Sequence, residues 1–303
     1  MGVPHIATSG FVVIRLGESW GMSEVARRPF LTPTLQAHGR RLVAAVEAGD
    51  GSILVTGEAM VGKSFLVRHW LKGVARERLL RLDLESLGSR SPVRQVGDHL
   101  EVGPALEGEA LARACSAALA GRPALTVVVE SAERLPEWVW QQLLTLYREV
   151  TGLHYLWIGR LDVKQRMEAS EYRPLAAAII HRVHLLAYSP EESERYCREY
   201  LGETAPEIQL SPEAHGAVYG FALGYLPNTE RVLDEAVALA RSQGRAEIKP
   251  LMVRVAIDAL RGTSEWRPPG ARERRGCAPR AALIVAGLAG LAAAMVAIAH
   301  LLA

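Results

Sequence analysis

Short apolar runs alternate with longer amphipathic stretches along the first part of the chain. The clearest run, Ala124–Val129, is rich in β-branched residues, as is typical of a buried strand. Stretches with apolar residues three to four positions apart follow these runs and predict helices. The expected strands are 52–56, 79–84, 124–129, 154–158 and 183–186, and the expected helices are 63–76, 92–101, 107–120, 135–150 and 163–179. This alternation predicts an α/β fold with a parallel sheet covered on both faces.

The pattern changes after the last of these strands, where helices follow one another. Ser189-Pro190-Glu191-Glu192 combines a capping hydroxyl, a proline at the first helical position and acids in the first turn, which together indicate a helix start. Ser211-Pro212-Glu213 repeats this signature, and two more helical patterns follow without a strand. Residues 189–262 are therefore expected to form a small α-helical domain beside a sheet domain of residues 25–188.

The chain ends in a long uncharged stretch. Residues 281–303 contain no Asp, Glu, Lys or Arg, and at 1.5 Å per residue a helix of this length measures about 34 Å, enough to cross the hydrocarbon core. The preceding segment, 263–280, is rich in Pro, Gly and Arg, as expected of a linker. Positive charge beside a span stays on the cytoplasmic side. The sequence therefore predicts a C-terminal transmembrane helix, with residues 1–280 in the cytoplasm.

Composition narrows the function classes further. The formal net charge is +2, so the overall charge balance does not indicate nucleic-acid binding. The three cysteines, Cys115, Cys197 and Cys277, lie far apart and have no metal-ligand spacing with the histidines. The N-terminal segment 1–24 lacks the long apolar run of a signal peptide. We expect a reducing compartment for the body of the chain.

One motif points to specific chemistry. Residues 57–64 fit the pattern G-x-x-x-x-G-K-[ST] between a predicted strand and a predicted helix, which is the context of a P-loop. The glycines let backbone N–H groups face a phosphate at the helix N-terminus. We expect Lys63 to reach the β- and γ-phosphates and the Ser64 hydroxyl to bind Mg²⁺. The predicted ATP-binding residues are Gly57, Glu58, Ala59, Met60, Val61, Gly62, Lys63, Ser64 and Phe65.

A P-loop also needs an acid at the end of a buried strand to hold Mg²⁺. Glu130 follows the run that ends at Val129 and is the candidate, although it could also be an exposed acid that binds no metal. The next position, where an acid that orients the attacking water usually stands, holds Ser131. Either Glu133 compensates for the missing acid, or hydrolysis is slow or absent.

The order of these motifs resembles that of a known family. It runs from Arg28-Pro29-Phe30 through the strand and P-loop at 54–64 to Glu130–Leu135 and then Leu156–Arg160. This order looks like the AAA+ ATPases of the general secretion pathway protein A (ExeA) type, and the transposition ATPases of the TniB/MuB type share most of it. The resemblance covers about residues 25–245 and implies a P-loop ATPase core followed by an α-helical lid.

The resemblance assigns roles to further residues and reveals departures from the family pattern. Arg160 stands at the sensor position after the fourth strand. Arg182 matches the arginine before the fifth strand, so it is either a finger for a neighbouring subunit's γ-phosphate or a surface charge. Asn228 replaces the second-sensor arginine of the lid, and Arg231 is a weak substitute one turn on. These departures concern hydrolysis and γ-phosphate sensing, whereas the P-loop is complete.

The expected function is that of a membrane-anchored AAA+ ATP-binding protein at a bacterial inner membrane. Its predicted catalytic residues are Lys63, Glu130, Glu133 and Arg182, and its predicted metal ligands are Ser64 and Glu130. Turnover depends on an oriented water and an arginine finger, so we expect ATP binding with slow hydrolysis. Such a protein suits a homo-oligomeric switch that assembles an envelope or secretion complex, and nucleic acid is not expected as a partner.

Two other functions fit the same residues. One is a non-catalytic membrane adaptor whose P-loop only stabilises the fold; its partners and its localisation should survive Lys63→Ala. The other is a DNA-linked ATPase of the transposition type. The predicted anchor and the nearly neutral charge argue against the latter.

Overall fold

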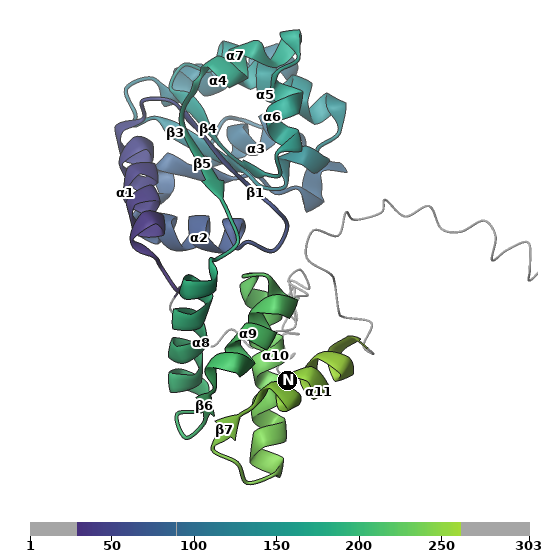
Figure 1. Cartoon of the computed structure of the whole chain (residues 1–303). Coiled ribbons are helices and arrows are strands. Elements are labelled where there is room, and N and C mark those ends of the chain that lie inside the picture. Colours follow the sequence, from purple (N-terminus) through teal and green to yellow (C-terminus); the bar gives the residue numbers. More distant parts are fainter. Residues whose placement is uncertain (1–28, 89, 262–303) are drawn as a thin grey trace, which may run out of the picture.

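The computed structural model describes residues 29–88 and 90–261, which form an α/β core and a helical lid (Figure 1). The core is built on five parallel strands in the spatial order β2-β3-β4-β1-β5. The strands are β1 (Ser52–Gly57), β2 (Leu79–Arg81), β3 (Leu125–Val129), β4 (Leu153–Gly159) and β5 (Ile179–Leu185). The predicted α/β class and parallel sheet are confirmed.

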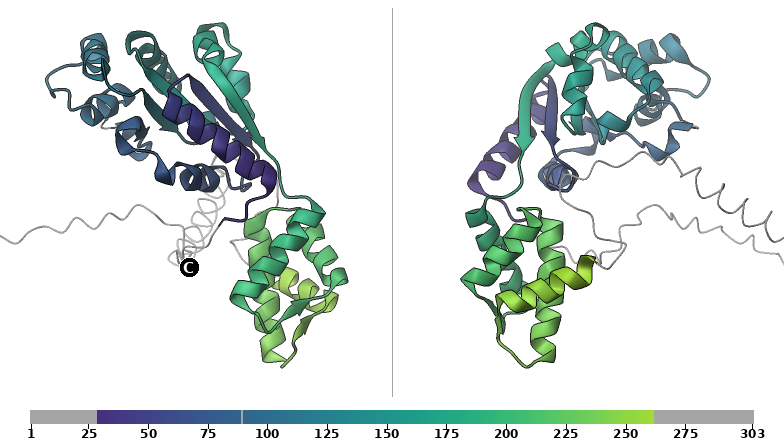
Figure 2. Two further views of the ribbon diagram at one scale, coloured as in Figure 1. Left: turned by 90° about the vertical axis from the view of Figure 1, so that its left-hand side faces the viewer. Right: turned by 45° about the vertical axis from the view of Figure 1, so that its right-hand side comes forward.

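Helices cover both faces of the sheet, as the turned views show (Figure 2). The helices α1 (Pro33–Ala48) and α2 (Lys63–Trp70) pack on one face; the opposite face carries α3 (Pro92–His99), α4 (Gly108–Leu119), α5 (Glu137–Glu149), α6 (Asp162–Met167) and α7 (Arg173–Ala177). Strand β1 shows the reason: Ile53 and Val55 belong to the cluster under α1 and α2, while Leu54 belongs to the opposite cluster. Residues alternate between the faces of a strand, so a strand buried on both faces reads as one continuous apolar run.

Short 3₁₀ turns connect several of these elements. They are η1 (Leu71–Gly73), η2 (Arg76–Arg78), η3 (Glu85–Gly88), η4 (Ala132–Arg134) and η5 (Ser170–Tyr172). Two helix predictions were wrong in extent because of such turns. The predicted helix 63–76 ends at Trp70, and the predicted helix 163–179 is divided into α6, η5 and α7, with Pro174 in the first turn of α7.

The lid contains α8 (Pro190–Thr204), α9 (Pro212–Ala222), α10 (Leu226–Ser242) and α11 (Pro250–Arg261). The helix start predicted at Ser189 is a full capping box: Ser189 Oγ accepts from Glu192 N, and Glu192 Oε2 accepts from Ser189 N. The expectation of a strand-free lid was wrong, because β6 (Gln209–Leu210) and β7 (Glu247–Ile248) form a short parallel pair. Because β6 follows α8 and β7 precedes α11, the pair holds the end of α8 beside the start of α11.

An aromatic contact joins the core to the lid. The Phe30 ring, just before α1, lies 5.5 Å from the rings of Tyr188 and Tyr196. The Tyr188 hydroxyl donates to the Phe30 carbonyl over 3.0 Å, and the Tyr188 N–H donates to the Gly224 carbonyl of the lid over 3.1 Å. A Cβ at Gly224 would lie 2.0 Å from the Tyr188 carbonyl oxygen, so this close approach requires glycine.

Three sequence predictions fall outside the described residues: the N-terminal segment 1–24, the linker 263–280 and the transmembrane helix 281–303. Within the described part, 29–88 and 90–261, no helix combines the length and the apolar character needed to span a membrane.

Candidate functional site

The loop between β1 and α2 has the geometry of a phosphate-binding loop. Strand β1 is buried along its whole length, and a Cβ at Gly57 would lie 2.5 Å from the Leu185 carbonyl oxygen of β5. Met60 and Gly62 have left-handed φ values of 68° and 86°, which turn the chain sharply into the helix. Gly62 occupies the N-cap of α2, and no side chain caps this end. The first N–H groups of α2 are thus positioned for an anion rather than for a capping side chain.

Lys63 lies against the backbone of this loop. Its Nζ donates to the carbonyl oxygens of Gly57, over 2.9 Å, and Glu58, over 2.7 Å. Burial lowers the pKa of Lys63, while the carboxylates of Glu133 and Glu58 act in the opposite direction and the charge of Arg160 lowers it further. These influences place the predicted sensor and the predicted acid within the electrostatic reach of the P-loop lysine.

Arg160 and Glu133 meet at the carboxyl ends of β3 and β4. The backbone N–H of Arg160 donates to Glu133 Oε2 over 3.1 Å, and its guanidinium lies 3.9 Å from Glu58 Oε2. Gly159 makes this approach possible, because a Cβ there would lie 2.5 Å from Glu133 Oε2. Two cations, Lys63 and Arg160, therefore stand among two carboxylates beside the loop.

Glu130 lies at the end of β3, as predicted, but pairs away from the P-loop. Its Oε1 is 2.5 Å from Nη2 of Arg81, at the end of β2 on the other side of β3. The side chain of Glu130 is 17% exposed, and the next residue, Ser131, has a left-handed φ of 48°. The backbone therefore turns at Ser131 and brings Glu133, rather than residue 131, to Arg160.

The oxygen donors near the loop fit a Mg²⁺ ion only if phosphates share it. The candidates are the Ser64 hydroxyl, in the first turn of α2, and the Glu130 carboxylate. Over the described ranges, no group of three or more His, Cys, Asp or Glu side chains could hold a metal ion. Mg²⁺ commonly binds through one or two protein oxygens plus substrate phosphates and water. These donors suit an ion that arrives with a nucleotide and supplies charge neutralisation at its phosphates.

No protein-family model and no curated protein matches the chain. Solved structures do match. Cdc6p from Pyrobaculum aerophilum has a TM-score of 0.57 and 13% identity, covering 78% of this chain and 69% of its own length. The Aeropyrum pernix ORC2 protein in its ADPNP-ADP complexes has a TM-score of 0.53 and 14% identity, covering 75% of this chain and 66% of its own length. The chain shares the fold of these two proteins.

A third match extends over more of this chain. Drosophila ORC, in a structure bound to DNA, has a TM-score of 0.52 and 15% identity, covering 87% of this chain and 74% of its own. This chain spans about two thirds of the ORC2 and Cdc6p chains, and at 13–14% identity the similarity shows the fold alone. The similarity supports the α/β parallel-sheet fold expected from the sequence; it does not distinguish the secretion-type family from its relatives.

Arg182, the candidate arginine finger, lies within the fifth strand and not before it. Strand β5 begins at Ile179, so the prediction that this strand starts at residue 183 was wrong. Arg182 pairs in register with Leu54 of β1, and its exposed guanidinium donates to the Ala176 carbonyl over 3.4 Å. β5 is an edge strand of the sheet. Arg182 is therefore on the outer edge of the core, beside β1, with its guanidinium directed to Ala176, which precedes β5.

The helical lid brings one residue near the P-loop that sequence reasoning missed. Tyr225, just before α10, packs against the cluster that contains Val61 of the loop, and the charge of Glu58 contributes to raising its pKa, after burial. Asn228, at the position of the expected second-sensor arginine, is 2% exposed, and its Nδ2 has no partner among the described residues. Arg231 lies on the exposed side of α10. The signal in the sequence was the aromatic residue directly after Gly224, which could have been expected to pack against the core.

Proposed function

We propose that this chain binds ATP through its P-loop and uses binding, more than hydrolysis, to switch the assembly of a protein complex. The observation that carries the proposal is Lys63 Nζ held by the Gly57 and Glu58 carbonyls beside the uncapped start of α2. A phosphate at this point receives the helix N–H groups and a lysine charge together. Such a cradle selects a nucleoside di- or triphosphate.

Slow hydrolysis is supported by the residues around the γ-phosphate position. Ser131 cannot act as the base that orients water, and Glu133 already accepts a hydrogen bond from the Arg160 N–H. The Arg160 guanidinium lies 3.9 Å from Glu58 beside the loop. A guanidinium stays protonated, so it can stabilise phosphate charge but cannot act as a base. Two carboxylates, Glu133 and Glu58, raise the pKa of Lys63, and Glu133 has the larger effect. We assign it the residual catalysis.

The test is steady-state ATP turnover by the full-length chain with Mg²⁺. The proposal predicts turnover well below the 1–10³ s⁻¹ that is common for enzymes, reduced about tenfold or more in Glu133→Gln because a general base contributes roughly 10²–10⁴-fold. The matched control is Glu149→Gln, an exposed acid at the end of α5. Fast turnover that is lost in Glu133→Gln would contradict the proposed switch and indicate a motor that is driven by hydrolysis.

Assembly is proposed to involve a homo-oligomer with Arg182 of one copy at the nucleotide of the next. Its exposure on the edge strand β5 supports a role at a contact between copies. The membrane helix at 281–303 and an envelope or secretion complex complete the proposal; both rest on the sequence. ATP-dependent oligomerisation measured by light scattering should be lost in Arg182→Ala, whereas Arg173→Ala, an exposed arginine of α7, should keep it.

A second function, a DNA-linked AAA+ ATPase, is favoured by one observation. Two of the similar structures were solved with DNA: Drosophila ORC, and the Aeropyrum pernix ORC1 protein with a TM-score of 0.50 and 16% identity, covering 77% of this chain and 66% of its own. This weighs against the expectation, based on net charge, that nucleic acid is not a partner. ATP turnover that rises several-fold on adding DNA would favour this function over the envelope role.

A further inference from the structure

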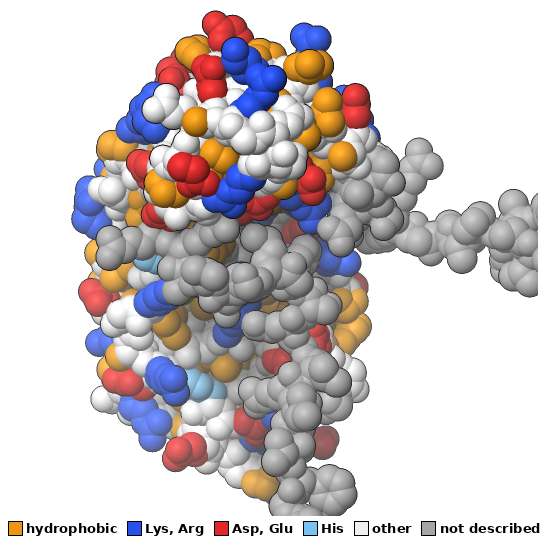
Figure 3. All heavy atoms as spheres, turned by 90° about the horizontal axis from the view of Figure 1, so that it is seen from below, with side chains coloured by type: hydrophobic (Ala, Val, Ile, Leu, Met, Phe, Trp, Pro, Cys, Tyr) orange, Lys and Arg blue, Asp and Glu red, His pale blue; other side chains and the backbone are white. Residues whose placement is uncertain are grey.

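Charge is distributed unevenly over the described residues. They carry 27 Lys and Arg against 29 Asp and Glu, so the body is slightly acidic. The elements α1, α2, η1 and η2 are the exception: apart from Lys63 of the P-loop they carry six Lys and Arg against two acids, Glu47 and Glu77. The lid shows no such bias, because cations and anions intersperse over the face seen from the lid end (Figure 3). The α1–η2 surface is therefore a local basic area that the net charge conceals.

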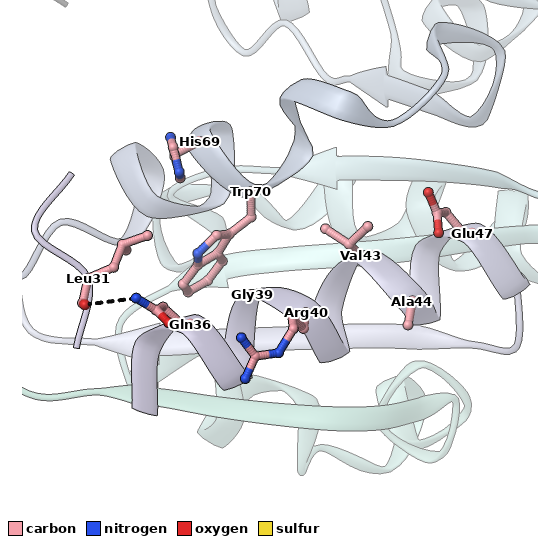
Figure 4. Close-up of a pocket in the computed structure, with 9 residues that line it drawn as sticks. All are labelled: Leu31, Gln36, Gly39, Arg40, Val43, Ala44, Glu47, His69 and Trp70. Carbon is pink, nitrogen blue, oxygen red and sulfur yellow. Dashed lines mark hydrogen bonds between the residues drawn. The ribbon is translucent and has the colours of Figure 1, made fainter. Parts of the chain in front are cut away.

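A groove of about 480 Å³ lies in this area, between α1 and α2. Figure 4 shows the Trp70 indole of α2 lying between the two helices, over Gly39 of α1. The ring lies so close that a Cβ at Gly39 would be 2.4 Å from Trp70 Nε1. Val43 and Leu31 supply apolar walls. The groove thus has an aromatic side chain of fixed orientation, with room for a unit the size of a nucleoside.

Cations stand around this groove. Arg40 and His69 line it, and Arg78 approaches its end, where the guanidinium donates to the Glu47 carbonyl over 2.8 Å. Lys72 and Arg76, on the exposed turns that follow α2, extend the series. Within the described ranges, no ion pair engages Arg40, Lys72 or Arg76, so their charges are available to a partner.

We propose that the α1–α2 groove binds single-stranded nucleic acid, with phosphates on the cations and a base on Trp70. Stacking on an aromatic ring beside a basic track is the sequence-tolerant way in which proteins hold single strands. An anionic membrane surface is the rival polyanion. Surface-bound helices insert large apolar side chains into the headgroup layer, whereas Phe65 is the one strongly exposed large apolar residue on these four elements. The groove and its charges fit a strand better.

The experiment is fluorescence anisotropy of a labelled 20-nucleotide strand and of the matching duplex, with the full-length chain. We expect the strand to bind with a log–log salt slope of about −3, as about four phosphate contacts would give. Arg40→Glu combined with Arg76→Glu should weaken binding at least tenfold. The matched control, Arg245→Glu with Arg254→Glu on exposed lid positions, carries the same charge change and should bind like wild type.

Trp70 provides the test of stacking. Trp70→Leu should weaken binding of the single strand about fivefold or more, as loss of one stacked base predicts. It should leave the weaker binding of the duplex unchanged. Trp70→Phe keeps a ring and should restore most of the affinity, which separates stacking from a folding defect. Equal losses for strand and duplex, or no rescue by Phe, would contradict the assignment of the base to Trp70.

Three further measurements test whether the strand binds in the α1–α2 groove. Lys63→Ala should bind the strand normally, because the groove is separate from the P-loop; failure of nucleotide binding would therefore leave this result intact. In a chain with Arg272, Arg274 and Arg275 replaced by Glu, the Arg40→Glu and Arg76→Glu changes should still weaken strand binding by the same factor as in the wild type. Absence of strand binding, binding lost only with those three arginines, or co-flotation with phosphatidylglycerol vesicles in place of strand binding would overturn the proposal.

Discussion

The backbone N–H of Arg160 donates a hydrogen bond to Glu133 Oε2 over 3.1 Å. This bond joins the end of β4 to η4, the turn that follows β3, across 27 residues of sequence. It fixes Glu133, whose charge acts on Lys63, whereas Ser131 has no carboxylate and Glu130 pairs with Arg81. The hydrogen bond therefore couples the backbone at Arg160 to the position of Glu133.

Gly159→Ala tests this coupling. The new Cβ would lie 2.5 Å from both Glu133 Oε2 and Val163 Cγ2, so Glu133 has to move. We expect ATP turnover to fall about tenfold or more while the ATP dissociation constant changes less than about threefold, because the P-loop is untouched. Stopped-flow binding and steady-state kinetics measure the two quantities. Turnover at the wild-type rate would show that Glu133 does not need this position.

Arg81→Ala tests whether Glu130 serves the metal. Removing Arg81 frees a carboxylate that the 2.5 Å ion pair holds. A partly exposed pair is worth about 1 kcal/mol or less, so the Mg²⁺ concentration for half-maximal ATP binding should fall by up to about fivefold. Glu130→Ala should raise it. If both variants leave the Mg²⁺ dependence unchanged, Glu130 is a structural partner of Arg81 and no metal ligand.

Gly39→Ala tests the packing of α1 on α2. In a helix interior this change normally stabilises by about 0.5–1 kcal/mol. At Gly39 three atoms of the Trp70 ring lie within 2.8 Å of the new Cβ, so we expect a net loss of about 1–3 kcal/mol from overpacking. Gly216→Ala in α9 is the control, because its Cβ meets open space and should stabilise. Urea unfolding followed by circular dichroism gives both values. Two variants of equal stability would contradict the close contact.

Stability should rise with pH through the mildly acidic range. Burial lowers the pKa of His154 below 6.5, and the same direction and cause hold for His215. Between the lowered pKa and 6.5 the unfolded chain binds more protons than the folded chain, so the free energy of unfolding increases with pH in that window and levels off above it. His154→Gln should flatten part of the rise between about pH 5 and about pH 7, measured from urea midpoints. An unchanged slope in the double variant with His215→Gln would exclude this origin.

The parts of the fold that rest on local pattern were predictable. Strand β3, the P-loop at 57–64 and the helix start at Ser189 each depend on neighbouring residues, and all three are found in the structure. Helix α1 was not predicted. Its place depends on the contact between Gly39 and Trp70, which neither segment reveals alone.

The site was predictable in its residues but not in its pairings. Lys63, Glu133 and Arg160 were all named from the sequence; Arg160 donates a hydrogen bond to Glu133, and the charges of both act on the pKa of Lys63. The ion pair of Glu130 with Arg81 could not be foreseen, because it depends on β2 lying beside β3 in the sheet. Arg182 was placed before its strand because the apolar run there begins at Val183, whereas hydrogen bonding to β1 extends β5 back to Ile179.

The central claim is that Lys63 and the loop around it bind ATP. Isothermal titration of the full-length chain with ATP and Mg²⁺ tests it most directly, with Lys63→Ala as the comparison and its circular dichroism spectrum as the check of folding. We expect a micromolar or tighter dissociation constant, weakened about tenfold or more by Lys63→Ala, the loss that about 1.4 kcal/mol of a charge-assisted contact represents. Absence of ATP binding, or equal affinity in a folded Lys63→Ala chain, would contradict the account.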